Sequence, residues 1–298
     1  MPGSARRDSQ AGIIELTADS IFKSVEYLST PEGIEQSLRQ KNDTSDLSFH
    51  VPPETGTMAQ LEAQAEVTEM NDASRPPSGS SQPMIGRNIT VSVSYLEIYN
   101  ESVNDLLDAN KRNLEVRDHQ GEVIVENLTY KTVRSTRDIE QLLEVGEQVR
   151  IIAGTKSNMT STRSHTVFRI HVEIDDRNVQ TCRHTIRTSQ IQIVDLAGSE
   201  GASKTQAQGL RLLEGKKINK SLLALSNVIL RLSQRQQMGS KHNYYINFRD
   251  SKLTRILQNS LCGKSQTAII CCISQSPANM QESLQALYFG SKAKSIRT

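Results

Sequence analysis

Three residues that can take part in phosphate chemistry stand close together after a short apolar stretch. The stretch, residues 191–194, is β-branched and mostly apolar, which predicts a strand buried in a sheet. Asp195, Gly198 and Glu200 follow it. A carboxylate at a strand end can hold Mg²⁺ through water, a glycine lets a backbone N–H approach a phosphate, and a second carboxylate can handle a proton. This combination indicates a site for phosphoryl transfer.

A second segment, NMTSTRSH at 158–165, contains the groups that would complete such a site. The hydroxyls of Ser161 and Thr162 can ligate a metal or contact phosphate oxygens. Arg163 and Glu200 carry opposite charges and could pair across the two segments, which would close the site and orient an attacking water. Each element is weak evidence alone, because hydroxyl-rich loops are common and an exposed Arg–Glu pair contributes little.

Alternating strands and helices must position these two segments. The apolar periodicity predicts helices over 12–40, 136–155, 251–261 and 281–294, and strands over 88–101, 165–175, 188–196 and 267–274. A hairpin over 114–128 should turn near Gly121. The clearest helix has Ile218, Leu222, Leu225, Ile229 and Leu232 on one face. This order predicts an α/β sheet whose functional edge lies at the C-terminal ends of its strands.

Composition limits the classes of protein. No run of about 18 apolar residues predicts a membrane span, and the N-terminus lacks the apolar region of a secretory signal. The aromatic content is 4% without Trp, which argues against a base-stacking platform and hence against a nucleic-acid partner. The adjacent Cys271 and Cys272 lie in the apolar run TAIICCIS and are expected to be buried strand residues. No CxxC spacing occurs, which fits a reducing, cytoplasmic location.

Charge is distributed unevenly along the chain. Residues 41–86 hold two bases and seven acids together with five of the eight prolines, and this composition predicts a disordered acidic loop. Residues 211–264 hold eleven bases and two acids. A basic surface of this density favours an acidic partner, either nucleic acid or an acidic protein.

Five motifs in order give the chain a resemblance to a known family. NMTSTRSH at 158–165 matches the switch I pattern NxxSSRSH, with Thr162 replacing the second serine and keeping the hydroxyl. DLAGSE at 195–200 matches switch II completely. SYLEIYNE at 94–101, INKSLLAL at 218–225 and FRDSKLTR at 248–255 are further signatures. Over 12–40 and 87–298 the chain therefore resembles a kinesin motor domain, and the CENP-E branch more than other branches.

The resemblance implies a fold, an activity and a set of residues. The fold would be a mixed central sheet flanked by helices, and the activity would be ATP-driven movement along microtubules with ATP and Mg²⁺ bound. Arg163 and Glu200 would form the catalytic switch salt bridge, and Thr162 and Asp195 would lie nearest the metal. The nucleotide-binding and nucleotide-sensing residues would be Asn158, Ser161, Thr162, Ser164, Asp195, Gly198 and Asn219. The microtubule-facing residues would be Lys241, Arg249, Lys252 and Arg255.

One family element has no counterpart in the sequence. No glycine begins a GxxxxGK[ST] phosphate loop, and the nearest match, GKS at 263–265, lacks the first glycine because position 258 is Gln258. We therefore expect 1–11 to be an unrelated leader and 12–298 a partial motor domain whose sheet is incomplete at its N-terminal strands. Three interpretations remain open: a truncated form of an active ATPase, a non-catalytic microtubule-binding module, or a partly folded remnant. The sequence does not predict direction of movement, cargo or oligomeric state.

Overall fold

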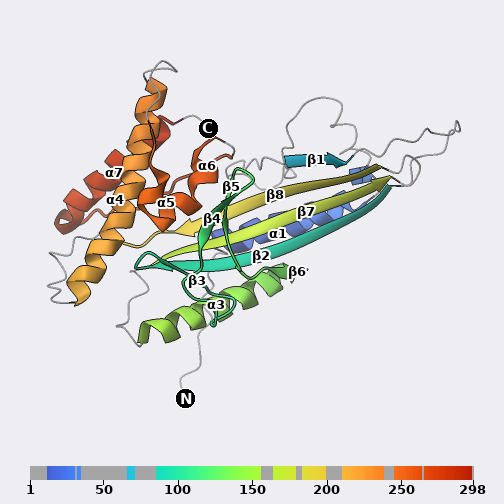
Figure 1. Ribbon diagram of the computed structural model, residues 1–298, viewed down its shortest axis with the longest axis horizontal. Coiled ribbons are helices and arrows are strands. Elements are labelled where there is room, and N and C mark those ends of the chain that lie inside the picture. Colours follow the sequence, from blue (N-terminus) through green and yellow to red (C-terminus); the bar gives the residue numbers. More distant parts are fainter. Residues whose placement is uncertain are drawn as a thin grey trace, which may run out of the picture. The chain divides into compact units, whose positions relative to one another are not determined.

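The computed structural model describes residues 12–30, 32–34, 66–70, 85–155, 164–178, 183–198, 210–237, 245–263 and 265–296 (Figure 1). The chain divides into two compact units. Unit 1 comprises residues 1–94, 130–145 and 169–193, and unit 2 comprises residues 95–129, 146–168 and 194–298.

A central six-stranded sheet organises the fold, in the order β1-β8-β7-β2-β3 with β6 also paired to β2. The pairs β1–β8, β2–β3 and β2–β6 are antiparallel. The separate pair β4–β5 is the hairpin expected around Gly121, which has a φ of +83°. The strands of the sheet are β1 (Glu66–Met70), β2 (Ile85–Tyr99), β3 (Ser102–Asp105), β6 (Lys131–Val133), β7 (His165–Asn178) and β8 (Arg183–Asp195); the hairpin is β4 (Val116–His119) and β5 (Glu122–Val125).

Helices make up the remaining elements, so the predicted α/β class is confirmed. They are α1 (Ile13–Leu28), α3 (Thr136–Thr155), α4 (Leu210–Gln237), α5 (Lys252–Ile256), α6 (Gln258–Leu261) and α7 (Met280–Lys294), with short 3₁₀ turns η2 (Phe248–Asp250) and η3 (Pro277–Asn279). The helix predicted over 12–40 is interrupted, because α1 ends at Leu28 and residues 32–34 are helical again; residues 35–40 lie outside the described residues. The helix predicted over 251–261 is two short helices, α5 and α6.

The core of unit 2 joins strands to the C-terminal helices. Leu96 of β2 and Val167 of β7 are fully buried in one cluster with Leu225 and Ile229 of α4 and Leu253 of α5. The predicted apolar face of α4 is therefore confirmed over its described side chains. Burial of five such side chains stabilises the unit by about 1.5–3 kcal/mol each.

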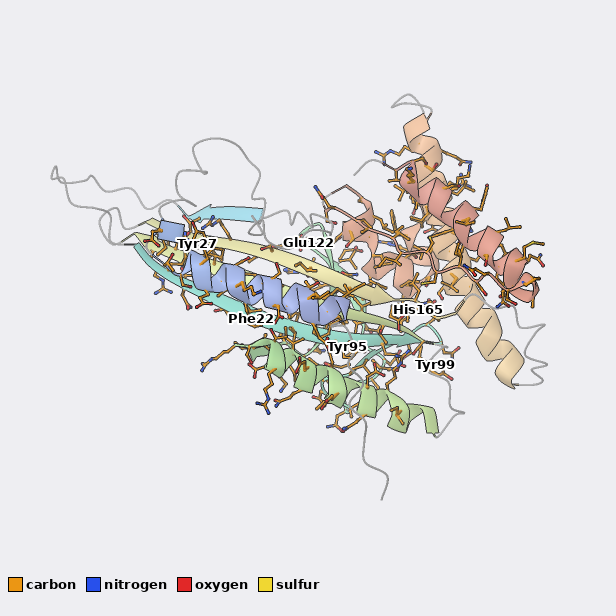
Figure 2. The ribbon with its side chains drawn as sticks, turned by 180° about the vertical axis from the view of Figure 1, so that it is seen from behind. Phe22, Tyr27, Tyr95, Tyr99, Glu122 and His165 are labelled. Atoms are coloured by element: carbon orange, nitrogen blue, oxygen red, sulfur yellow. The ribbon has the colours of Figure 1, made fainter. Side chains whose placement is uncertain are left out.

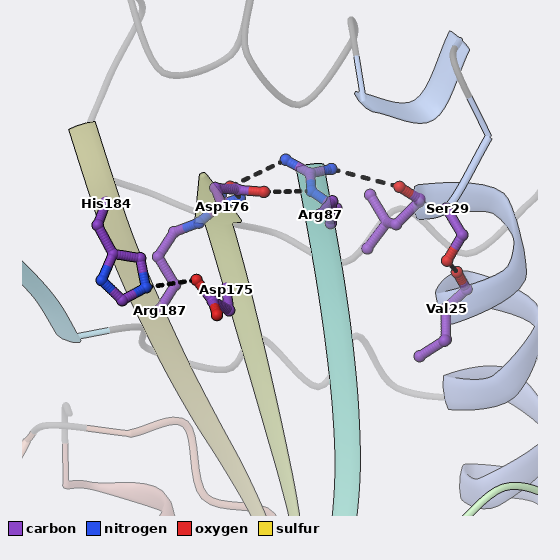
Figure 3. Close-up of polar contacts among 8 residues, drawn as sticks. Val25, Ser29, Arg87, Asp175, Asp176, His184 and Arg187 are labelled. Atoms are coloured by element: carbon purple, nitrogen blue, oxygen red, sulfur yellow. Dashed lines mark hydrogen bonds and ion pairs between the residues drawn. The ribbon is translucent and has the colours of Figure 1, made fainter. Parts of the chain in front are cut away.

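Unit 1 is held partly by a buried charge cluster. Two arginines converge on one carboxylate: Arg87 of β2 reaches both oxygens of Asp176 at 2.5 and 3.0 Å, and Arg187 of β8 donates to the same carboxylate at 2.6 Å (Figure 3). Arg87 also donates to the carbonyl of Leu28 at the end of α1. The side chains of Arg87, Asp176 and Arg187 are 1%, 13% and 6% exposed. One carboxylate thus ties β2, β7 and β8 together, and Arg87 connects them to α1.

The prediction that TAIICCIS, residues 267–274, forms a strand is wrong. Residues 266–276 form neither strand nor helix, Cys272 is exposed and Cys271 is only partly buried. Ile270 and Ile273 are 72% and 57% exposed. A run of β-branched apolar residues becomes a strand only when another strand supplies its hydrogen bonds, and the described part of the chain contains no such neighbour for it.

Two further expectations need revision. Within 41–86, residues 66–70 form β1 against β8, so the disorder prediction does not hold for these five residues. Most of the remaining segment lies outside the described residues. The strand residues 191–194 are only partly buried, whereas full burial was expected.

Among the described helices, none is long and apolar enough to span a membrane.

Candidate functional site

The residues after β8 form the first part of the site. Asp195 ends the strand and is exposed, Ala197 is buried, and Gly198 is partly buried. The structure therefore places Asp195 and Gly198 at a strand end, as predicted. Several predicted site residues lie outside the described part of the chain: Asn158, Ser161, Thr162, Arg163, Glu200 and Lys241. Asn219 lies in α4, where only its backbone is described.

His165, which the sequence reasoning did not select, joins three elements of unit 2. It is the first residue of β7 and is 2% exposed (Figure 2). The backbone N–H of Ala197 donates to its Nδ1 at 2.9 Å, and its Nε2 lies 2.7 Å from the hydroxyl of Ser221 on α4. Because a backbone amide can only donate, Nδ1 accepts and the proton resides on Nε2. His165 is thus a neutral bridge between residue 197 and α4.

Arg150 of α3 holds the neighbouring residue, Ser164, in place. Its Nε donates to the Ser164 hydroxyl at 3.2 Å and its Nη2 to the Ser164 carbonyl at 3.4 Å. The guanidinium also lies 3.9 Å from Glu97 and 3.5 Å from Glu147. Since Ser164 is only 4% exposed, its hydroxyl serves this internal network. These hydrogen bonds fix Ser164, the residue directly before β7.

Tyr95 extends the same network. Its hydroxyl donates to Glu147 at 2.7 Å, and its ring meets Phe168 edge-on with centroids 5.5 Å apart. Burial, followed by the hydrogen bond to Glu147, raises the pKa of Tyr95 well above its usual range. Tyr95 is therefore a neutral donor at every pH of interest.

The basic surface is the second part of the site. Arg249 lies in η2, while Lys252 and Arg255 lie in α5. Ser251 caps α5 by accepting from the Leu253 N–H at 3.1 Å. Glu101 accepts from the Ser251 hydroxyl at 2.7 Å and from the Lys252 N–H at 2.9 Å.

Glu101 is positioned by an unusual turn. It follows Asn100 between β2 and β3, and both residues have positive φ angles, 54° and 64°. A non-glycine residue rarely adopts this conformation outside a tight hairpin turn. A carboxylate at the first turn of α5 also suits the N-terminal end of the helix. The turn therefore aims Glu101 at the basic helix and fixes the orientation of that helix in unit 2.

The neutral state of His165 predicts a pH dependence of stability. Burial lowers the pKa of His165 to about 4 from the ordinary 6.5. The unfolded chain binds the proton more readily, so stability present above pH 6.5 is lost as the pH falls toward 4. Between pH 7 and pH 5 we expect a loss of about 2 kcal/mol from this residue. Urea unfolding of the wild type and His165→Gln at both pH values measures it.

His171 also contributes to the pH dependence of stability measured in that experiment. Burial and the nearby Arg169 lower its pKa to about 4 as well, and its contribution is the same in both proteins. The difference between wild type and variant therefore isolates His165. An equal loss of stability in the two proteins between pH 7 and pH 5 would contradict the assigned neutral bridge.

Comparisons with known proteins identify similar sequences. The kinesin motor domain model matches residues 1–296. Kinesin-related protein 4 of Dictyostelium discoideum is 43% identical over 222 residues, covering 72% of this chain and 11% of that protein. Kinesin-like protein KIN-7L of Oryza sativa is 43% identical, covering 70% and 32%, and human Kinesin-like protein KIF19 is 42% identical, covering 78% and 22%. The chain thus spans between about a tenth and a third of the length of these relatives.

Solved structures give the same result. A fast kinesin is 42% identical with a TM-score of 0.62, covering 71% of this chain and 57% of that chain. A KIF14 dimer, in a two-heads-bound state with AMP-PNP and in complex with a microtubule, is 37% identical with a TM-score of 0.61, covering 70% and 59%. From its sheet, its switch motifs and these matches, the chain belongs to the kinesin motor domain family.

Proposed function

We propose that this chain is a microtubule-binding protein of the kinesin motor-domain family and acts on the cytoskeleton. The observation that carries the proposal is the basic surface of unit 2, formed by Arg249 of η2 and by Lys252 and Arg255 of α5. Glu101 accepts hydrogen bonds at the first turn of α5. Tubulin presents an acidic surface, so charge complementarity favours it as the partner. The KIF14 structure in complex with a microtubule supports the same partner for this fold.

The family activity is ATP-driven movement along microtubules, and the contribution of ATP to this chain is a separate question. Asp195 and Gly198 stand at the strand end, where a carboxylate and an accessible backbone suit Mg²⁺ and a phosphate. Thr162 would assist at the metal, and Arg163 with Glu200 would close the site. When bound, ATP and Mg²⁺ would supply the γ-phosphate that the two switch segments sense. Ser164 and His165 would then help to keep the two switch segments in position.

The 298 residues contain no GxxxxGK[ST] sequence to cradle the β- and γ-phosphates. We therefore propose that this chain binds microtubules without requiring nucleotide. The alternative is that it is part of an ATPase whose phosphate loop is supplied by sequence beyond these residues. The CENP-E-like branch stays a prediction alongside this proposal.

Co-sedimentation with stabilised microtubules tests the binding proposal. The chain should pellet with microtubules at low salt and lose affinity as salt rises through about 0.15 M, where the screening length is about 8 Å. The loss is expected because the surface acts through exposed charges. Absence of binding at low salt, or binding that does not respond to salt, would contradict the proposed surface.

A further inference from the structure

Two of the arginines of the basic surface are already paired within the chain. Arg249 Nη2 and Arg255 Nη2 both donate to Oδ2 of Asp118, at 3.0 and 2.7 Å. Asp118 lies in β4 of the hairpin, and α5 packs on both hairpin strands within unit 2. In the sequence, Arg249 and Arg255 lie more than 130 positions from Asp118. The fold therefore pairs an acid of the hairpin with two arginines of a segment that the sequence shows as basic.

The solvent exposure of the three side chains determines whether a binding partner can compete for this contact. The side chains of Arg249 and Asp118 are 70% and 47% exposed, and that of Arg255 is 20% exposed. An acid and a base that both reach solvent can exchange partners, because an exposed ion pair contributes little to stability. A carboxylate on a binding partner can therefore displace Asp118 most readily from Arg249, the more exposed of the two arginines. It must compete with Asp118 to do so.

The summed charge of this surface also affects its attraction for an acidic partner. Asp118 places one negative charge between the guanidinium groups of Arg249 and Arg255, in addition to the charges of Asp250 in η2 and of Glu101 at the start of α5. Attraction of an acidic partner depends on the summed local charge as well as on individual contacts. Asp118 lowers both contributions at once.

We propose that Asp118 is an internal competitor that sets the affinity of the basic surface for carboxylates of an acidic protein partner. Its carboxylate occupies Arg249 and Arg255 in the free protein and yields them when a partner binds. Its two described side-chain contacts are with Arg249 and Arg255, so the expected effect is on the strength of binding at these arginines. This inference rests on the proposed microtubule binding for the identity of the partner.

Asp118→Asn tests the proposal, with Glu122→Gln as the matched control. Glu122 lies on the same hairpin, opposite His119, and no described ion pair joins it to Arg249 or Arg255. Both variants remove one negative charge from the hairpin. In microtubule co-sedimentation at low salt, Asp118→Asn should raise affinity about three- to tenfold and steepen the salt dependence, whereas Glu122→Gln should change affinity less than about twofold. Equal gains in both variants, or no gain in Asp118→Asn, would overturn the proposal.

A second probe separates this inference from the proposed function. Binding of a fluorescent poly-glutamate peptide, followed by anisotropy, should show the same ranking of the variants. If the wild type binds poly-glutamate but not microtubules, and Asp118→Asn binds the peptide more tightly, the inference holds while the proposed partner is wrong. Asp118→Ser provides a second substitution should Asp118→Asn fold poorly, and it should give the same gain. A gain that persists when Arg249 and Arg255 are both changed to Gln would contradict the assigned mechanism.

Discussion

Replacing Lys252 and Arg255 together with Glu should abolish microtubule co-sedimentation. The double change alters the charge of α5 by four units and places acids against an acidic partner, where like charges repel. Asp118, which pairs with Arg255 in the wild type, would add to the repulsion. The corresponding double Ala variant should weaken binding about tenfold, because each exposed ion pair contributes up to about 1 kcal/mol.

The matched control reverses the charge of two lysines of unit 1. Lys23 of α1 and Lys131 of β6 are exposed and belong to unit 1. Their joint replacement by Glu changes the net charge by the same amount, and binding should fall much less. Circular dichroism checks that each variant is folded. Equal losses in the two double variants would mean that net charge alone, and not the η2–α5 surface, governs binding.

Asp176→Asn should destabilise unit 1 by about 3–5 kcal/mol, because it leaves Arg87 and Arg187 buried without a compensating charge. Burial alone would raise the pKa of Asp176, but the two arginines lower it below its usual value. The stabilisation is therefore present above about pH 4 and is lost as the pH falls through the lowered pKa. Urea unfolding at pH 7 measures the effect of the substitution.

The adjacent residue is a matched control for Asp176. Asp175 pairs with His184 (Figure 3) and with Arg177. The side chains of Arg177 and His184 are 71% and 42% exposed. Asp175→Asn should cost less than about 1 kcal/mol, because water can replace the lost partner. The same cost for both variants would contradict the role assigned to burial in this cluster.

Local pattern was sufficient to predict most elements of the fold. The apolar positions of α4 repeat at helical spacing, and Leu225, Ile229 and Leu232 are buried as expected. Gly121 takes the positive φ of the predicted hairpin turn. The segment TAIICCIS shows the limit of this reasoning: its composition favours a strand, but strand formation depends on a partner that no local pattern reveals.

The candidate site was predictable only where its residues belong to motifs. Asp195 and Gly198 lie where the switch II pattern indicated, and Arg249, Lys252 and Arg255 lie on one surface. The contacts of His165 with Ser221, of Glu101 with Ser251 and of Asp118 with Arg255 join positions 56, 150 and 137 residues apart. Charge and spacing along the chain contain no information on such pairs, since the fold alone brings them together.

Microtubule co-sedimentation of the wild type and Glu200→Ala, each with and without Mg²⁺ and ATP, tests most directly whether the basic surface acts without nucleotide. All four samples should pellet with the same affinity at low salt, because these 298 residues contain no GxxxxGK[ST] sequence to hold the γ-phosphate that Glu200 would sense. Each should lose binding equally as salt increases. A change of affinity with ATP in the wild type that disappears in Glu200→Ala would contradict this account and would show a working nucleotide switch.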